Sequence, residues 1–175
     1  MNRVAKFYRV SFEQFLKDYC DTLELDSSDV NTVIKVREVW DSIKLPRRST
    51  KDSAGYDIGS TMSFVLEPNQ TVKIPTGIKC EMESGWVLKI YPRSGLGFKY
   101  RLQLNNCVAI IDGDYINSDN EGHIFLKLTN DSNENKTLEV NTGDKVVQGI
   151  FVPYGITIDD DADGVRNGGF GSTGK

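Results

Sequence analysis

The beginning of the chain carries apolar side chains at helical spacing. They recur every three or four positions, at Phe12, Phe15, Leu16, Tyr19 and Leu23, as on one face of an amphipathic helix. Ser11 stands just before this stretch with Glu13 close behind it, so Ser11 is a candidate N-cap. A polar break follows from Asp26 to Asn31. We therefore expect an appended helix within residues 1–31, packed on the body of the protein or on a neighbouring subunit.

From Thr32 onward the pattern changes to short runs in which apolar and polar residues alternate. Residues 33–39, Val-Ile-Lys-Val-Arg-Glu-Val, alternate at period two, which predicts a strand. Further runs of this kind are separated by Pro, Gly, Asn and Asp, the residues that favour turns. These runs cover residues 63–66, 71–74, 77–82, 86–91, 108–111, 123–129, 136–140 and 146–152.

Many short strands with no helical pattern after residue 32 are typical of an all-β domain. We predict a jelly-roll-type β-barrel over residues 32–157, preceded by a short N-terminal helical extension in residues 1–31. Residues 158–175 begin as an acidic, weakly patterned linker and end in a glycine-rich tail. Such a tail buries almost nothing, so we expect it to be flexible.

Composition narrows the possible functions. The chain has 175 residues and a formal net charge of −4, which argues against a non-specific nucleic-acid binder. We see no apolar run near the roughly 20 residues of a membrane span and no signal-peptide pattern. Three scattered cysteines without a C-x-x-C pair favour a reduced, cytoplasmic setting. The single histidine, His123, argues against a Ser-His-Asp triad or a multi-histidine metal site.

The final residues, 166–175, carry the clearest chemical signal. Their backbone N–H groups, the hydroxyls of Ser172 and Thr173 and the guanidinium of Arg166 suit phosphate oxygens. Phe170 has no apolar neighbours in this segment, but its ring can cover a flat base. These residue types predict a flap that closes over a nucleoside polyphosphate. The alternative is a glycine-rich tail with no binding role.

Two blocks on predicted turns have the residues of an anion site. In Ser53-Ala-Gly-Tyr-Asp-Ile58, small residues allow close approach of the backbone, and Asp57 follows on the next strand. In Tyr91-Pro-Arg-Ser-Gly-Leu-Gly97, an Arg, a hydroxyl and a glycine after a strand can form a small anion cradle. Taken singly, each block is also consistent with an ordinary tight turn.

Two further blocks complete the set. In residues 106–115, Asn-Cys-Val-Ala-Ile-Ile-Asp-Gly-Asp-Tyr, an apolar strand leads into two acids and a tyrosine. An aspartate there, Asp112, can polarise a water as a general base, and Tyr115 can stack on a sugar. Residues 143–148, Gly-Asp-Lys-Val-Val-Gln, form a turn that feeds a strand beginning with a glutamine amide. Ordinary hairpin turns remain the alternative for both blocks.

Taken together and in this order, the blocks resemble the five motifs of the trimeric dUTP diphosphatase (dUTPase) family. The family patterns are A-G-Y-D-L, P-R-S-G-L, N-x-x-G-x-I-D-x-D-Y, G-D-R-I-A-Q and a terminal R-G-x-G-G-F-G-S-T-G, and the resemblance covers residues 32–175. It implies a jelly-roll barrel that assembles as a homotrimer with three active sites, each built from all three chains. It also implies hydrolysis of dUTP to dUMP and pyrophosphate, with Mg²⁺ bound to the phosphates.

The resemblance also implies a role for each matching residue. Asp112 would orient and activate the water that attacks the α-phosphorus, Asn106 would pair with uracil, and Tyr115 would pack on deoxyribose and reject ribose. Asp57 would hold the metal through water. The remaining residues would bind substrate: Arg93, Ser94, Gly95 and Gln148 at the phosphates, Arg166, Gly171, Ser172 and Thr173 at the outer phosphates in the tail, and Phe170 over the uracil.

The chain departs from the family pattern in three places. Ala109 stands where the family has Gly, the segment from Ile116 to His123 is longer than usual, and the spacing from Arg166 to Phe170 is one residue shorter. We expect the long segment to form an extended loop.

Two alternative functions stay open. A dCTP deaminase shares the fold but needs a glutamate base, for which Glu121 is the candidate. A protein-binding regulatory role would use the N-terminal helix and the long loop.

Overall fold

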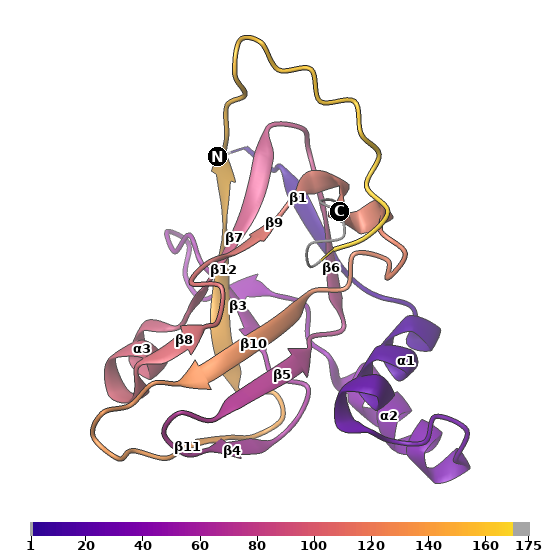
Figure 1. Ribbon diagram of the computed structural model, residues 1–175, viewed down its shortest axis with the longest axis vertical. Helices are drawn as coiled ribbons and strands as arrows, with labels where there is room; N and C mark the ends of the chain where they lie inside the picture. The colour runs from indigo at the N-terminus through magenta and orange to yellow at the C-terminus, as the bar shows by residue number, and fades with distance from the viewer. Residues whose placement is uncertain (1, 170–175) are drawn as a thin grey trace.

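The structure of the protein, a computed structural model, describes residues 2–169 and is mostly β (Figure 1). In chain order its elements are β1 (Ala5–Arg9), α1 (Phe12–Leu23), α2 (Val30–Ser42), β2 (Arg47–Arg48), β3 (Tyr56–Gly59), β4 (Phe64–Leu66), β5 (Thr71–Pro75), β6 (Ile78–Met82), β7 (Trp86–Pro92), α3 (Ser94–Tyr100), β8 (Leu102–Leu104), β9 (Ala109–Ile111), the 3₁₀ helix η1 (Gly113–Asn117), β10 (Phe125–Asn130), β11 (Leu138–Val140) and β12 (Lys145–Pro153).

All strand pairs are antiparallel, and they form four sheets among the described residues. The largest has the order β2-β3-β12-β7-β9, a second has the order β5-β10-β8, and β1-β6 and β11-β4 form two pairs. One apolar core lies among them and includes Ile58, Leu88, Ile90, Leu126 and Leu128, all fully buried. No closed barrel is found in residues 2–169.

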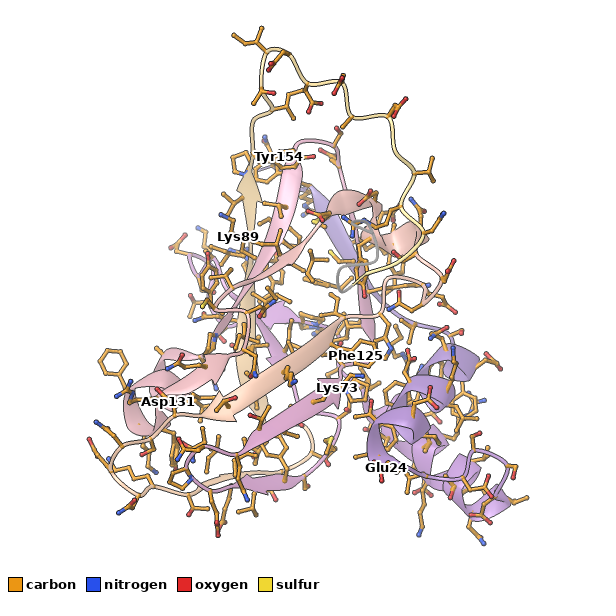
Figure 2. The ribbon with its side chains drawn as sticks, in the orientation of Figure 1. Glu24, Lys73, Lys89, Phe125, Asp131 and Tyr154 are labelled. Atoms are coloured by element: carbon orange, nitrogen blue, oxygen red, sulfur yellow. The ribbon has the colours of Figure 1, made fainter. Side chains whose placement is uncertain are left out.

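On the outer face of the second sheet, the Lys73 ammonium lies 4.5 Å from the centre of the Phe125 ring (Figure 2).

The N-terminal segment is attached to the sheets at several points. Strand β1 pairs with β6, and α1 and α2 lie together beside the β5 and β6 end of the molecule (Figure 1). Ser11 caps α1 by accepting a hydrogen bond from the Gln14 backbone N–H at 3.1 Å, as predicted. The two helices share a second apolar cluster in which Phe15, Tyr19 and Val36 are buried.

The strand predicted at residues 33–39 is wrong, because this segment lies within helix α2. Asp29 caps the helix and accepts a hydrogen bond from the Thr32 backbone N–H at 2.8 Å. Val33, Val36 and Trp40 pack into the apolar cluster shared by the two helices. Their spacing of three and four residues is that of a helix, although the same segment was interpreted as an alternating strand. The expectation of no helix beyond residue 32 also fails, since α2 continues to Ser42 and α3 and η1 follow.

The other predicted strands are confirmed, with shifts of up to two residues at their ends. Strands β1, β2 and β8 were not predicted. The last two are only two and three residues long, too short for alternation to be visible. Within residues 2–169 no helix is long and apolar enough to cross a membrane. The predicted site residues Phe170, Gly171, Ser172 and Thr173 lie outside the described residues.

Glu121, in the long loop after η1, joins this loop to the N-terminal segment. Its carboxylate accepts hydrogen bonds from the Ser11 hydroxyl at 2.5 Å and the Ser11 backbone N–H at 3.0 Å, and it pairs with Lys79 at 2.8 Å. Burial alone would raise the pKa of Glu121, but the bonds from Lys79 and Ser11 outweigh it and lower the pKa to about 2. The loop is therefore fixed to the start of α1 by an ionised carboxylate.

The turn between β5 and β6 provides a test of how closely α1 packs on the sheets. Gly77 has a φ of +70°, and a Cβ there would lie 2.3 Å from Ile43 Cδ1 and 3.2 Å from the Phe15 ring. We predict that Gly77→Ala lowers the free energy of unfolding by about 2 kcal/mol or more, from overpacking plus backbone strain. Gly85→Ala is the control, since Gly85 has a similar φ of +82° and nothing within 4 Å. Equal urea denaturation midpoints for the two variants would contradict the prediction.

The low pKa of Glu121 predicts an acid-dependent loss of stability. A carboxyl group with a depressed folded-state pKa stabilises the fold above its unfolded pKa, and this contribution is lost as pH falls through the folded-state value. The contribution of Glu121 is therefore full above pH 4.5 and is lost as the pH approaches 2. Urea unfolding at several pH values should show that Glu121→Gln is destabilised near neutral pH and that its difference from wild type shrinks in this window. A difference independent of pH would contradict the ionised contact.

Candidate functional site

The five-stranded sheet brings three of the predicted blocks together. Strand β12 lies between β3 and β7, and Gln148 on β12 is paired with Asp57 on β3 and with Tyr91 on β7. Arg93 follows directly after β7 and is the N-cap residue of α3. Its backbone N–H donates to the carbonyl of Val146 on β12 at 3.2 Å. Residues far apart in the sequence thus meet at one end of this sheet.

Asp57 is the electrostatic centre of this group. Lys145 donates to its carboxylate at 2.7 Å, the Ser49 hydroxyl donates at 3.0 Å, and Arg93 Nε lies 3.2 Å from the other oxygen. Burial would raise the pKa of Asp57, but the hydrogen bonds from Lys145 and Ser49 and the charge of Arg93 lower it below its usual range. The result is an ionised carboxylate among cations, and we refer to Asp57, Arg93, Ser94, Lys145 and Gln148 as the phosphate-side cluster.

The segment predicted as an anion cradle is the start of a helix. Ser94 is the first residue of α3, and Ser94 and Gly95 are exposed there. The first N–H groups of a helix have no carbonyl partner within the helix, so this turn directs backbone donors as well as the Ser94 hydroxyl outward. The tight turn considered as the alternative is instead the first turn of a helix, and the residue types suited to an anion are exposed there.

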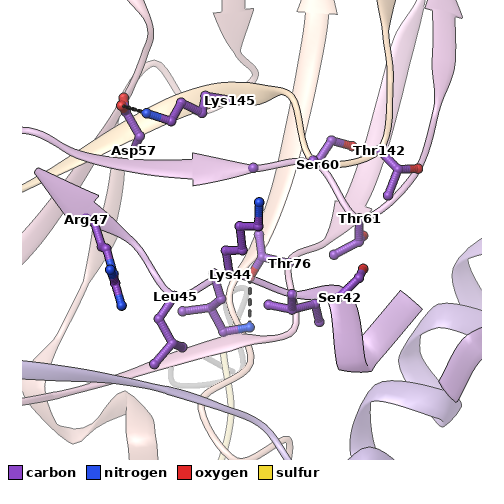
Figure 3. Close-up of a pocket in the computed structure, with 14 residues that line it drawn as sticks. Ser42, Lys44, Leu45, Arg47, Asp57, Ser60, Thr61, Thr76, Thr142 and Lys145 are labelled. Atoms are coloured by element: carbon purple, nitrogen blue, oxygen red, sulfur yellow. Dashed lines mark hydrogen bonds and ion pairs between the residues drawn. The ribbon is translucent and has the colours of Figure 1, made fainter. Parts of the chain in front are cut away.

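A cavity of about 600 Å³ lies beside the phosphate-side cluster. Figure 3 shows the Asp57–Lys145 pair on one side of this cavity, with Arg47 and Lys44 from the chain that follows α2 on another. Ser60, Thr61 and Thr76 also line it. The cavity has more cationic than anionic side chains, so the charge around Asp57 favours an anion nearby.

Asp112 belongs to a different group of residues. It follows directly after β9 and precedes η1, which carries Asp114 and Tyr115. Arg166 bridges the two acids: its Nη2 lies 2.5 Å from Asp112 and its Nε lies 2.7 Å from Asp114. The guanidinium therefore contacts both the predicted general base and its acidic neighbour in the same chain. We refer to Asp112, Asp114, Tyr115 and Arg166 as the base-side cluster.

Tyr115 is held from two sides. Its hydroxyl donates to the backbone carbonyl of His123 at 2.9 Å and accepts from Asn120 Nδ2 at 2.9 Å. The Arg166 guanidinium lies 5.9 Å from the ring centre, and the residue is only 7% exposed. Burial raises the pKa of Tyr115, and the hydrogen bond from Asn120 offsets only part of that effect. The ring is therefore fixed in position beside the two acids.

Asn106 lies in the short turn between β8 and β9 and is exposed. Cys107 follows with a φ of +62°, and the Val108 backbone N–H donates to the Asn106 carbonyl. Within the described part of the chain the Asn106 side chain makes no hydrogen bond. Its amide is thus open to a ligand on the surface of the molecule.

The two clusters lie far apart in one chain. Ile111 pairs with Leu88 of β7, so Asp112 lies beside Val87, whereas Arg93 is six residues further along. At about 3.3 Å per residue, the distance along the strand is about 20 Å. Figure 1 shows the same separation, with α3 and η1 at opposite ends of the sheet. A single chain does not bring Asp112 to the phosphate-side cluster.

Several residues at these clusters were missed from the sequence. Lys145 lies in the fourth block and Asp114 in the third, but the sequence did not indicate that Lys145 pairs with Asp57 or that Asp114 pairs with Arg166. Ser49 and Asn120 contact Asp57 and Tyr115 through single hydrogen bonds, and no motif in the sequence marks them. Arg166 was predicted to bind outer phosphates; in the structure it pairs with Asp112 and Asp114.

No group of three or more His, Cys, Asp or Glu side chains in residues 2–169 could hold a metal ion. Asp57 offers a carboxylate beside one cavity, and Asp112 and Asp114 border a second. A cation bound at Asp57 would need additional oxygen ligands, and the oxygens of a polyphosphate are of the type that Mg²⁺ prefers.

Comparisons with known proteins agree on one family. The dUTPase family model matches residues 41–174. The deoxyuridine 5′-triphosphate nucleotidohydrolase of Lactococcus lactis is 44% identical over 135 residues, covering 75% of this chain and 89% of the relative. The dUTPase of Streptococcus mutans is 40% identical with a TM-score of 0.57, covering 66% of this chain and 88% of that chain.

A structure of more distant sequence shows the same fold. A mutant of the dUTPase from phage phi11 of Staphylococcus aureus is 24% identical with a TM-score of 0.56, covering 71% of this chain and 92% of that chain. The family match spans most of the chain, and the Lactococcus relative is nearly as long as the segment it matches. The chain belongs to the dUTPase family.

Proposed function

We propose that this protein hydrolyses dUTP to dUMP and pyrophosphate at active sites shared between copies of the chain. The 44% identical relative is a deoxyuridine 5′-triphosphate nucleotidohydrolase, which supports the reaction. The observation that carries the shared site is the position of Asp112, at the opposite end of β7 from the phosphate-side cluster. A base that activates water must lie within hydrogen-bond reach of the reacting group, so a second chain has to supply one of the clusters.

We propose that Asp112 is the general base. Its carboxylate accepts a proton from a water whose oxygen attacks the α-phosphorus. A new bond forms between this oxygen and the α-phosphorus, the bond to the oxygen that bridges to the β-phosphate breaks, and pyrophosphate leaves. Such phosphoryl transfer depends mainly on positioning and charge stabilisation. The position of Asp112 at a strand end, only partly buried, suits a group that must reach a water.

The phosphate-side cluster would bind the triphosphate. Arg93, Ser94, Gly95 and Gln148 combine a guanidinium, a hydroxyl, helix-start N–H groups and an amide, and all of these can donate to phosphate oxygens. Asn106 would pair with uracil through its unbonded amide. Tyr115 would pack on deoxyribose, where its fixed ring leaves no room for a 2′-hydroxyl. Selection by shape and by unpaired polar groups then distinguishes dUTP from UTP and dCTP.

We propose Mg²⁺ as the cofactor, bound by the phosphates and held through water by Asp57. The phage phi11 dUTPase has a structural Mg(II) ion, which supports the metal only at the level of the family. When bound, the ion supplies charge neutralisation on the phosphates. In this chain, Asp57 is ionised and paired with Lys145 and Arg93. Its negative charge would attract the hydrated metal, and the two cations would pair with the phosphates.

We propose a homotrimer as the assembly, with the four sheets of each chain forming a jelly-roll barrel. Exposed apolar side chains support contacts between copies: Ile110 on β9, Val65 on β4 and Phe98 on α3 are all more than half exposed. The tail would then close over the site, with Arg166, Gly171, Ser172 and Thr173 on the phosphates and Phe170 over the uracil. The free cysteines of the described residues support a cytoplasmic location.

The structure offers no support for the deaminase alternative. That reaction needs a glutamate base, and Glu121, the candidate, is held by Ser11 and Lys79. A regulatory role beside catalysis remains a proposal. The helices α1 and α2 form the candidate surface, with Val30 and Ile34 exposed on α2.

Asp112→Asn provides the direct test of the reaction. It removes the proton acceptor without changing the size of the side chain. We predict that pyrophosphate release from dUTP falls by about a thousandfold in kcat, and that wild type prefers dUTP over UTP, dCTP and dTTP in the presence of Mg²⁺. Asp131→Asn serves as the control, because Asp131 is an aspartate that pairs with Arg101 and Gln103 and with neither cluster. Release of ammonia from dCTP, or full activity of Asp112→Asn, would overturn the assignment.

Arg166 makes a second prediction. Since it bridges two carboxylates and is proposed to move to the phosphates, we predict that Arg166→Ala lowers kcat/KM by about 100-fold. Arg166→Lys should recover little, because an ammonium cannot replace the planar fork of a guanidinium. Arg101→Ala is the matched control, since Arg101 pairs with Asp131 at 2.9 Å away from both clusters. Wild-type kcat/KM in Arg166→Ala would show that the bridge has no part in the reaction.

A further inference from the structure

A chain of buried polar contacts runs from helix α1 to Tyr115. It begins at Asp18 on α1, passes through His123 and ends at the Tyr115 hydroxyl. All three residues are at least mostly buried, with exposed side-chain fractions of 12% for Asp18 and 0% for His123. Neither Asp18 nor His123 belongs to either cluster of the candidate site.

The two ring nitrogens of His123 have different partners. Nε2 accepts a hydrogen bond from the Gly77 backbone N–H at 2.8 Å, so this nitrogen carries no proton. The ring proton is therefore on Nδ1, which donates to Asp18 at 2.6 Å. Burial would raise the pKa of Asp18, but the hydrogen bonds from His123 and Gln14 lower it. Asp18 is thus a carboxylate that fixes both the tautomer and the orientation of the imidazole.

The backbone of His123 holds Tyr115. Its carbonyl accepts from the Tyr115 hydroxyl at 2.9 Å, and Asn120 donates to the same hydroxyl at 2.9 Å. The loop that joins these residues folds tightly onto η1, since a Cβ at Gly122 would lie 2.8 Å from the Tyr115 carbonyl oxygen. Because loop and ring are packed together, a shift of the His123 side chain moves the group that anchors Tyr115.

We propose that Asp18 and His123 are positioning residues for Tyr115, so that helix α1 sets the sugar pocket that separates deoxyribose from ribose. This inference rests on the proposed function, in which Tyr115 packs on the deoxyribose. Ribose differs from deoxyribose by one oxygen atom at the 2′ position. A small displacement of the Tyr115 ring would make room for this atom and so weaken the rejection of ribose. The long loop and the N-terminal helix, two features outside the family motifs, thereby gain a shared role in selectivity.

The test measures the ratio of kcat/KM for dUTP to that for UTP. This ratio does not depend on the fraction of folded enzyme, so a purely structural loss leaves it unchanged. We expect Asp18→Ala to lower the ratio by about tenfold. Asp18→Asn, which keeps an acceptor for His123 Nδ1–H, should stay within about threefold of wild type. Asp21→Ala, an exposed aspartate on the same helix, should match wild type.

Tyr115→Phe is the second variant, because it removes the last bond of the chain of contacts without touching α1. We expect it to lower the ratio as well, by about tenfold. An unchanged ratio in a folded Asp18→Ala, or in Tyr115→Phe, would overturn the proposal. Failure of the proposed function looks different: wild type itself would then show no preference for dUTP over UTP.

Discussion

The antiparallel pairing of β12 with both β3 and β7 is the constraint on which the site depends. This pairing places Gln148 between Asp57 and Tyr91 and brings Arg93 to the same end of the sheet. The register of β7 with β9 fixes Asp112 at the other end. A strand rises by about 3.3 Å per residue. The two clusters, at opposite ends of β7, therefore do not meet within one chain. The geometry of one sheet thus leads to the proposal of a site between chains.

Both clusters consist of carboxylates paired with cationic side chains. Asp57 is held by Lys145 and Arg93, and Asp112 and Asp114 are held by Arg166. In each case carboxylates and cations are paired with one another. A triphosphate with its metal presents both kinds of charge, so these groups can exchange partners instead of entering or leaving water unpaired. This exchange is consistent with phosphoryl chemistry, in which positioned charges contribute most of the rate.

The sequence predicted the strands better than the helices. Alternation located eight of the strands, and the spacing of Phe12, Phe15 and Tyr19 with the cap at Ser11 located α1. It failed at residues 33–39, where the valines recur at every third position and pack as one face of a helix against α1.

The site residues were found as motifs, but their arrangement was not visible in the sequence. Nothing local indicates that Arg166 bridges Asp112 and Asp114, or that Asp18 reaches His123 across 105 positions. These contacts depend on tertiary packing of α1 and on the path of the tail.

The most direct test of the shared site is complementation between two inactive variants. Arg93→Ala disables the phosphate-side cluster and Asp112→Asn disables the base-side cluster, and the two chains are produced together in equal amounts. If each site takes its clusters from different chains, roughly a quarter of the sites in the mixed oligomers contain both intact groups, and dUTP hydrolysis returns. If each chain formed its own complete site, every site would carry one defect, and the mixture would stay as inactive as either variant alone.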